Sequence, residues 1–258
     1  MTEAFQWKNS ISKSLRKTVG RAIGDFCMID EGDKILLGLS GGKDSLVLLH
    51  ALSEFRRRSP ASFSLLACTV AIAGGSAPEV DLSNLEAYCA ARDVPYIVIR
   101  HPIIEILEAR SERSPCSFCA NMRRGILSGC AREHGCRKLA LGHSLDDAIE
   151  TFYLNILRGG RARSFRPKFF QDRTEIDIIR PLIYAREQAV IDEAARLSLP
   201  VLPTNCPYAG KTERQRVKGL LEDVSKLFPD VYRNTLSALK KLSDNDRWGV
   251  ETNESARN

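Results

Sequence analysis

The sequence predicts an α/β protein built on a doubly wound, mostly parallel sheet. Short apolar runs, such as Lys34–Leu39, alternate with longer segments in which apolar side chains recur at helical spacing. A glycine-rich segment, residues 40–45, stands between the first of these runs and the helical pattern that begins at Leu46. Strand, glycine turn and helix in this order are typical of parallel sheets that bind ligands at the carboxyl ends of their strands.

The expected elements follow one another along the whole chain. The expected strands are apolar runs bounded by turn residues: Lys34–Leu39, Phe63–Val70, Tyr96–Arg100, Lys138–Leu141 and Ile176–Ile179. The expected helices have apolar residues at helical spacing: about 5–27, a segment from Leu46, Asp81–Arg92, Met122–His134, Leu145–Leu157 and Glu187–Leu197. We expect loops at 73–78 and at the Arg-rich stretch Gly159–Lys168.

The chain is expected to form one α/β domain with short extensions. A basic amphipathic helix is expected in residues 1–30, and the α/β domain, with a Cys-x-x-Cys insertion, in residues 31–200. Residues 201–245 are expected to hold a turn with a further cysteine and then C-terminal helices, and residues 246–258 a disordered tail.

Composition narrows the class of protein. The chain has 258 residues, 43% of them hydrophobic, which is enough to bury a full core. Its formal net charge of +6 makes nucleic acid a candidate partner without deciding the matter. No apolar run approaches the roughly 20 residues of a membrane helix, and the N-terminus lacks the apolar core of a secretory signal, so we expect a cytoplasmic protein. In that compartment, eight cysteines favour metal ligands, reactive thiols or buried thiols over disulfides.

The glycine-rich segment has the composition of a phosphate-binding loop. Glycines at a strand-to-helix turn let backbone N–H groups approach an anion, which the helix dipole also attracts. The spacing of a Walker A loop is absent. Lys43 is expected to neutralise phosphate charge, and Asp44 to help hold Mg²⁺. The sequence SGGKDS resembles the ATP loop of the N-type ATP pyrophosphatases, which implies ATP binding by Ser40, Gly41, Gly42, Lys43, Asp44 and Ser45. The alternative is a purely structural glycine turn.

A second polar turn, Gly142–Asp147, follows another expected strand and opens another helix. Because the carboxyl ends of parallel strands meet at one edge of the sheet, this turn is expected beside the glycine-rich segment. In the pyrophosphatases the matching element implies that Gly142 and His143 approach the nucleotide and that Asp146 or Asp147 shares the metal. A purely structural role, capping the helix that follows, is the alternative for the two aspartates.

Three cysteines form a candidate metal centre. Cys116 and Cys119 form a Cys-x-x-Cys pair, expected in a loop, and Cys206 lies in a second expected turn. Three thiolates suit a [4Fe–4S] cluster with one open iron, whereas a zinc site would take a fourth ligand. A catalytic persulfide pair is a further option. The other cysteines examined for spacing are expected to be structural: Cys27, Cys68, Cys89, Cys130 and Cys136.

Four segments together resemble the tRNA-cytidine 2-sulfurtransferase family: SGGKDS, PCSFCANMRRGIL, LALGHSLDDAIETFYLNILRGG and IIRPL. They occur in the family's order, with similar gaps, from about Gly20 to Leu242. The resemblance implies an adenine-nucleotide alpha hydrolase-like (PP-loop) fold. The lysidine synthetases share the ATP loop but lack the Cys-x-x-Cys followed by RRGIL, so the chain resembles them less.

The resemblance also implies a reaction. ATP adenylates the C2 oxygen of the cytidine at position 32 in the tRNA anticodon loop, and sulfur then displaces AMP. The sulfur comes from sulfide on a [4Fe–4S] cluster or from a persulfide delivered by a cysteine desulfurase. Lys43, Asp44 and Asp147 are the implied catalytic residues, and Asp44, Asp146 and Asp147 the implied Mg²⁺ ligands. Homodimers are common among relatives, so a homodimer is also an expectation.

A group of arginines is expected to contact tRNA phosphates, with a solvated basic face as the alternative: Arg123, Arg124, Arg158, Arg161 and Arg163.

Three departures from the family pattern bear on which nucleotide is the acceptor. The second strand ends in Thr69-Val70-Ala71 without an acidic residue, the second turn is GHSLDD instead of GHHRDD, and Cys206 is one position out of the expected register. They leave the ATP chemistry unchanged.

Two other functions remain open from the sequence. One is an iron–sulfur PP-loop enzyme that thiolates a different base or a small molecule. The other is a zinc-stapled RNA-binding module, which would hold zinc and form no AMP. Dependence of ATP turnover on RNA, and the metal that the protein holds, distinguish them from tRNA thiolation.

Overall fold

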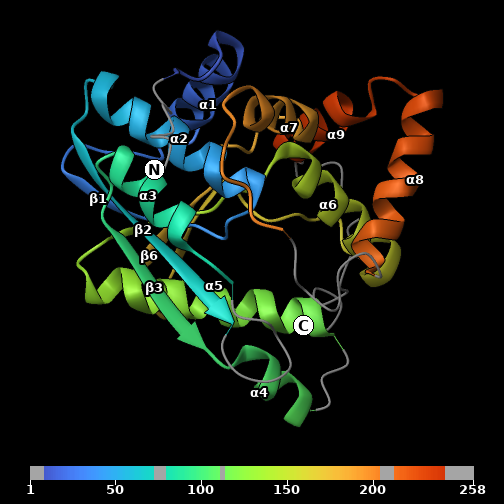
Figure 1. Ribbon diagram of the computed structural model, residues 1–258. Helices are drawn as coiled ribbons and strands as arrows, with labels where there is room; N and C mark the ends of the chain where they lie inside the picture. Colours follow the sequence, from blue (N-terminus) through green and yellow to red (C-terminus); the bar gives the residue numbers. More distant parts are fainter. Residues whose placement is uncertain (1–8, 73–79, 111–113, 204–211, 242–258) are drawn as a thin grey trace, which may run out of the picture.

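The computed structural model describes residues 9–72, 80–110, 114–203 and 212–241 (Figure 1). The strands are β1 (Asp33–Gly38), β2 (Phe63–Ile72), β3 (Tyr96–His101), β4 (Lys138–Ala140), β5 (Lys168–Gln171) and β6 (Ile176–Ile179). The helices are α1 (Lys13–Asp25), α2 (Lys43–Arg58), α3 (Ser83–Ala91), α4 (Ile103–Ala109), α5 (Pro115–Glu133), α6 (Leu145–Gly159), α7 (Glu187–Arg196), α8 (Glu213–Leu227) and α9 (Val231–Lys241).

The strands form one sheet in the order β3-β2-β1-β4-β6-β5. Every pair is parallel except the edge pair β5–β6, which is antiparallel. In the centre, Leu37 of β1 lies opposite Ala140 of β4, and Ala140 lies opposite Ile179 of β6. The carboxyl ends of β1, β4 and β6 therefore meet at one edge, and the turns that leave these strands are neighbours. The prediction of a doubly wound, mostly parallel sheet is confirmed.

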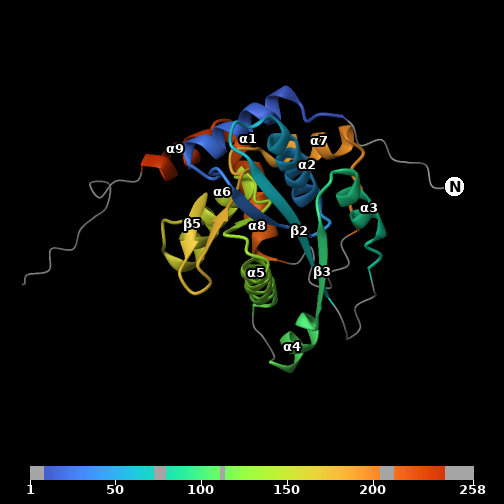
Figure 2. The same ribbon diagram turned by 90° about the vertical axis from the view of Figure 1, so that its left-hand side faces the viewer.

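Helices cover both faces of the sheet, so the central strands are apolar on both sides. In Figures 1 and 2, α5 lies against one face and α1, α2 and α7 lie against the other. The α2 side holds the larger core, to which α1 contributes Leu15, Val19 and Ala22. The α5 side holds a second core with Leu36, Leu127 and Leu139 among its members. A third cluster joins α6, α8 and α9, and its buried residues are Leu145, Ile149, Val217, Leu221, Val231 and Tyr232.

The five expected strands are present. Ile176–Ile179 has the predicted bounds, and the other four differ by one or two residues at their ends. Two elements were missed: α4, and β5, which pairs with β6 at the sheet edge. The expectation that the Cys-x-x-Cys pair lies in a loop is wrong, because α5 begins at Pro115 and contains both cysteines. Proline at the first helical position has a preset φ and needs no hydrogen-bond partner for its nitrogen, so it starts the helix. The loop at 73–78 and the tail 246–258 lie outside the described residues.

Among the helices that the structure describes, none is long and apolar enough to cross a membrane.

Candidate functional site

The glycine-rich segment, called here the glycine loop (residues 40–45), joins β1 to α2. Its shape is fixed by two serines. The Ser45 hydroxyl donates to the Gly42 carbonyl at 2.9 Å, and the Ser40 backbone N–H donates to Ser45 Oγ at 3.1 Å. Gly41 has a φ of +81°, a conformation that side chains with a Cβ rarely adopt. A Cβ at Gly41 would also lie 2.6 Å from Cδ1 of Leu202, whose backbone N–H donates to the Gly41 carbonyl.

The N-terminus of α2 is open. Its N-cap residue is Gly42, and no side chain caps the first turn. The first N–H groups of a helix have no partner within the helix, and the helix dipole adds partial positive charge there. An anion at this end would meet backbone donors and Lys43 together, which is the arrangement expected of a phosphate site.

Charged side chains from three helices surround Lys43. Its ammonium group lies 2.9 Å from Asp44 Oδ2 and 3.0 Å from Oε1 of Glu187 on α7. Lys218 on α8 pairs with the other carboxylate oxygen of Glu187. Burial opposes the charge on Lys43, but Asp44 and Glu187 outweigh it and raise the pKa of Lys43. Lys43 is therefore charged at neutral pH and is held by two carboxylates at the open end of α2.

Asp44 has one carboxylate oxygen that is buried and unpaired. Its Oδ1 is buried and has no hydrogen-bond partner. Burial raises the pKa of Asp44, the charges of Asp147 and Glu187 raise it further, and Lys43 opposes the rise. A carboxylate oxygen left unpaired among other acidic groups is suited to a cation.

The second turn, Gly142–Asp147, lies against the first. A Cβ at Gly142 would lie 2.9 Å from the carbonyl carbon of Asp44 and 3.0 Å from the backbone nitrogen of Ser45. Only glycine permits the two backbones to approach so closely. The position of Gly142 thus places the second turn directly beside the start of α2.

The aspartates of the second turn are held by neighbouring helices. Asp147 forms a capping box with Ser144, and its Oδ1 lies 2.9 Å from Nη1 of Arg214 on α8. Asp146 accepts from the backbone N–H of Glu187 at 2.6 Å and pairs with Arg186. The two side chains therefore tie α6 to α8 and to α7. In the described parts of the chain, no three His, Cys, Asp or Glu side chains gather so as to hold a metal ion.

His143 is held by an arginine. The Nε of Arg180, the residue after β6, donates to His143 Nδ1 at 3.1 Å. The His143 ring lies 4.9 Å from the Phe165 ring, centroid to centroid. Burial, with a smaller effect of the Arg180 charge, lowers the pKa of His143 to about 4. His143 is therefore neutral at physiological pH.

Cys116 and Cys119 lie in the first two turns of α5. Cys116 is exposed, and Cys119 is partly buried against the core on that side of the sheet. A spacing of three residues places both side chains on one face of the helix. Cys206 lies outside the described residues. Four of the cysteines expected to be structural are buried: Cys68, Cys89, Cys130 and Cys136. The fifth, Cys27, is exposed just after the end of α1 and has a φ of +44°.

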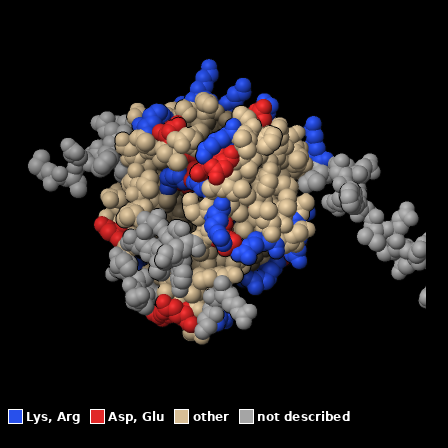
Figure 3. Space-filling view, turned by 90° about the vertical axis from the view of Figure 1, so that its right-hand side faces the viewer, with Lys and Arg blue, Asp and Glu red and all other residues tan. Residues whose placement is uncertain are grey.

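The five predicted RNA-binding arginines fall into two groups. Arg123 and Arg124 are half-buried on α5, and Arg124 donates to Asn121. The other three, Arg158, Arg161 and Arg163, are exposed at and after the end of α6. Arg158 pairs with Glu213 of α8. On the face toward α8, basic side chains gather beside acidic ones around a hollow (Figure 3).

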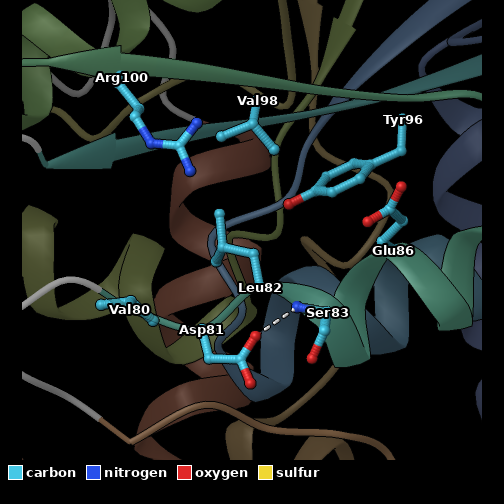
Figure 4. A pocket seen from close by; sticks show the side chains of 8 residues that line it. All are labelled: Val80, Asp81, Leu82, Ser83, Glu86, Tyr96, Val98 and Arg100. Atoms are coloured by element: carbon cyan, nitrogen blue, oxygen red, sulfur yellow. Dashed lines mark hydrogen bonds between the residues drawn. The ribbon is translucent and has the colours of Figure 1, made fainter.

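A cavity of about 650 Å³ lies between the edge strand β3 and α3. Its lining includes Tyr96, Val98 and Arg100, which alternate along β3 and point toward Leu82 and Glu86 (Figure 4). In the sheet, β2 separates β3 from β1. None of the residues predicted from the sequence lines this cavity.

Sequence reasoning missed five charged residues that complete the site: Arg180, Arg186, Glu187, Arg214 and Lys218. Arg180 belongs to IIRPL, one of the segments that carried the family resemblance, so a signal for it was present. The others lie on α7 and α8 or just before α7, and reach the site only through tertiary packing. No spacing in the sequence relates Glu187 or Arg214 to the glycine loop.

Comparisons with known proteins agree with this geometry. Residues 11–204 match the PP-loop domain family. The tRNA-cytidine(32) 2-sulfurtransferase of Geobacter metallireducens is 39% identical over 233 residues, which cover 89% of this chain and 90% of that protein. The protein of the same name from Hahella chejuensis is 37% identical over 237 residues, covering 91% and 82%. The structure of the U34-tRNA thiolase NcsA from Methanococcus maripaludis with its [4Fe-4S] cluster matches with a TM-score of 0.72 and 25% identity, covering 90% of this chain and 79% of that one. The chain therefore belongs to the PP-loop proteins, in the family of the tRNA-cytidine(32) 2-sulfurtransferases.

Proposed function

We propose that this protein uses ATP to replace the C2 oxygen of cytidine 32 in tRNA with sulfur. The observation that carries the proposal is the open N-terminus of α2, where backbone N–H groups and Lys43 meet beside the unpaired carboxylate oxygen of Asp44. Relatives that match most of the chain are named for this reaction. The glycine loop offers backbone donors and a cation to the phosphates of ATP. The acceptor, cytidine 32, is proposed from the relatives that are named for it.

The first half-reaction is adenylation. The C2 oxygen of cytidine attacks the α-phosphorus of ATP, the bond to the β-phosphate oxygen breaks, and pyrophosphate leaves. Lys43 exchanges its contacts with Asp44 and Glu187 for the phosphates and stabilises the charge on the departing pyrophosphate. In the second half-reaction a sulfur nucleophile adds at C2, and AMP leaves with the original oxygen. A pyrimidine oxygen is a poor leaving group until it is esterified, so adenylation must come first.

Magnesium is proposed at Asp44 and Asp147. Protein-bound Mg²⁺ usually takes one or two carboxylates and completes its shell with substrate phosphates and water, so a preformed cage is not required. The unpaired Oδ1 of Asp44 fits this role. The charge of Asp147 raises the pKa of Asp44, so the two carboxylates are near each other, and this supports Asp147 as a second ligand of the same cation. Asp147 is also paired, through Oδ1 with Arg214 and through Oδ2 with Ser144, so Mg²⁺ would take the place of Arg214 at Oδ1. Both oxygens of Asp146 contact Arg186, and one of them also accepts from the first backbone N–H of α7, so we leave Asp146 out of the proposed metal site.

An iron–sulfur cluster is proposed at Cys116, Cys119 and Cys206. The exposed Cys116 and the partly buried Cys119 present two thiol groups on one face of α5, which suits two ligands of one cluster. When bound, a [4Fe–4S] cluster with three protein ligands would supply an open iron at which sulfide for the second half-reaction is carried. The last described residues before Cys206 reach the ATP loop, because Leu202 contacts Gly41.

The partners follow from the same proposal. The exposed side chains of Arg158, Arg161 and Arg163 offer contacts to tRNA phosphates beside α8. Arg123 and Arg124 offer two further contacts on α5, the helix that carries the cysteine pair. A cysteine desulfurase is the proposed sulfur donor, the cytoplasm the proposed compartment, and a homodimer the proposed assembly.

The proposal is tested by purifying the protein without oxygen and measuring iron, sulfide and zinc, together with thiolation of a tRNA transcript and its C32U variant. We expect about four irons per chain, loss of most of that iron in Cys116→Ala, and sulfur transfer to the C32 transcript alone. Cys27→Ala, which removes another exposed cysteine, is the matched control and should keep its iron. Stoichiometric zinc without AMP formation would contradict the proposal and favour an RNA-binding module. AMP formation without dependence on tRNA would favour a small-molecule substrate.

A further inference from the structure

Arg180 is a buried cation that no carboxylate of the described residues neutralises. It is only 2% exposed, and it forms no ion pair with any carboxylate in the described part of the chain. Its guanidinium carbon lies 4.7 Å from the Phe165 ring centroid and 5.4 Å from that of Phe169, and its Nη1 donates to the Arg166 carbonyl at 2.6 Å. Burial lowers the pKa of Arg180 to about 10, so it remains charged at neutral pH. Burying such a group is costly, which calls for a role beyond packing.

The hydrogen bond from Arg180 determines which nitrogen of His143 carries the proton. A guanidinium group has only donors, so His143 Nδ1 must accept from Arg180 Nε and cannot itself be protonated. In a neutral imidazole the proton then sits on Nε2. Among the described residues, His143 Nε2 has no hydrogen-bond partner. The side chain thus presents one donor of fixed identity and orientation.

His143 lies beside the proposed ATP site. Gly142, the preceding residue, packs against the backbone of Asp44 and Ser45. Arg180 directly follows β6, His143 lies three residues after the end of β4, and these strands are parallel neighbours. Both residues therefore lie at the edge of the sheet from which α2 begins.

We propose that Arg180 is a positioning residue that holds His143 with its proton on Nε2, so that Nε2–H donates to a phosphate oxygen of the bound nucleotide. This inference rests on the proposed ATP-dependent activity. A neutral donor stabilises charge that develops on phosphate oxygens without releasing its proton to them. An unrestrained imidazole would divide its population between two tautomers and several orientations, and only part of it would present the donor.

The proton position is measured by long-range proton–nitrogen NMR correlation on full-length protein with ¹⁵N-labelled histidine, without nucleotide. The chain has only four histidines, and His143→Gln identifies the signals of His143. We expect its unprotonated nitrogen to correlate with Hε1 and not with Hδ2, as Nδ1 does. A proton on Nδ1 in the wild type would overturn the proposal. Because the measurement needs no turnover, it gives its result even if the protein does not thiolate tRNA.

Arg180→Met keeps much of the side-chain volume and removes the donors. We expect averaged nitrogen signals for His143 and an AMP-forming rate lowered about 10- to 100-fold, as for other residues that orient a functional histidine. Arg180→Lys, which keeps a charged donor, should recover part of both effects. An unchanged His143 spectrum in Arg180→Met would show that Arg180 is structural and would overturn the proposal.

Two controls test whether a general loss of stability explains the effect and whether His143 contacts the nucleotide. Arg92→Met removes another buried arginine that contacts a histidine, His50, so it reproduces the loss of stability and should leave the His143 signals unchanged. Addition of a non-hydrolysable ATP analogue should shift the Nε2–H signal of His143 in the wild type. Binding of the analogue without such a shift would overturn the assigned contact, whereas absence of analogue binding would instead count against the proposed function.

Discussion

The two strand-to-helix turns at the centre of the sheet share a location and differ in how they end. The glycine loop leads into α2 through Gly42, and no side chain caps that helix. The turn after β4 leads into α6 through Ser144, and a capping box with Asp147 satisfies the first donors of the helix. One helix N-terminus is thus left open to a ligand, and the other is closed by its own sequence.

The difference indicates that the first turn is suited to bind a ligand, whereas the second turn has a mainly structural role. The first turn keeps its backbone donors and Lys43 for an anion. The second turn approaches the first closely at Gly142, and it ties the charges of Asp146 and Asp147 to Arg186 and Arg214. These ion pairs reduce the repulsion that two carboxylates would exert on a triphosphate, so the acidic turn can lie beside the phosphate site.

The largest expected effect is on activity and concerns the open turn. Lys43→Ala removes the cation that meets the phosphates, and we expect AMP formation to fall about 100- to 1,000-fold, the effect typical of removing one preorganised charge-stabilising group. The measurement is pyrophosphate release at saturating tRNA. Lys226→Ala removes an exposed lysine that pairs with Asp223 on the same helix, away from the glycine loop in sequence, so it should keep the wild-type rate. A similar loss in that variant would mean that general charge, and not the position of Lys43, matters.

The second expected effect is on stability and concerns α6. Burial, with a smaller effect of the nearby Asp147, raises the pKa of Glu150 to about 7, while Arg214 and Lys218 oppose the rise and Glu187 adds to it. The folded protein then holds a proton on Glu150 that the unfolded chain has released above its ordinary pKa of 4.5. The free energy of unfolding therefore falls as the pH rises from about 4.5 to about 7 and stays lower above that.

Glu150→Gln removes this pH-dependent loss. We expect the variant to be more stable than the wild type at pH 8, by up to about 3 kcal/mol, and to match it near pH 4.5, where both side chains are neutral. Urea unfolding at the two pH values measures the difference. Glu105→Gln, at an exposed position on α4, should show no such dependence. Equal stabilities of Glu150→Gln and wild type at both pH values would show that Glu150 titrates normally.

Much of the fold was predictable because local signals and tertiary structure agree. Apolar runs marked the buried strands, and Ser40–Ser45 marked the turn before α2. The exceptions have physical causes. The strand β5 is short, antiparallel and at the edge, with Phe170 exposed, so it lacks the apolar run of a central strand. The start of α5 was missed because the Cys-x-x-Cys pair interrupts the apolar period, although Pro115 marks the first helical position.

The candidate site was predictable in its backbone and not in its charge network. The two turns could be placed side by side from the order of strands and helices. The partners of Lys43 and Asp147, namely Glu187, Lys218 and Arg214, come from α7 and α8, and the packing of those helices against α2 and α6 brings them to the turns. The charged residues around the two turns therefore belong to no sequence motif, and only the folded structure shows that they are part of the site.

A smaller effect is expected where the two turns touch. Gly142→Ala places a Cβ within about 3 Å of the Asp44 backbone, which must then move away. We expect a loss of about 1–3 kcal/mol of stability, as for other overpacked positions. A lower affinity for ATP should accompany it, because α2 moves relative to β4. Thermal unfolding and ATP titration measure the two effects. Gly159→Ala adds a Cβ that meets nothing within 4 Å, so it should bind ATP normally.

The smallest expected effect is on the closed turn itself. Ser144→Ala removes the hydroxyl that accepts from the Asp147 N–H, and we expect a loss of about 1 kcal/mol of stability, as for other N-cap serines. ATP turnover should stay close to that of the wild type, because the backbone N–H of Ser144 and Arg214 still hold the Asp147 carboxylate. Thr212→Ala, which removes the N-cap hydroxyl of α8, is the matched control. If Ser144→Ala instead lost activity as Lys43→Ala does, the second turn would bind the nucleotide through its hydroxyl, and the division between an open and a closed turn would be wrong.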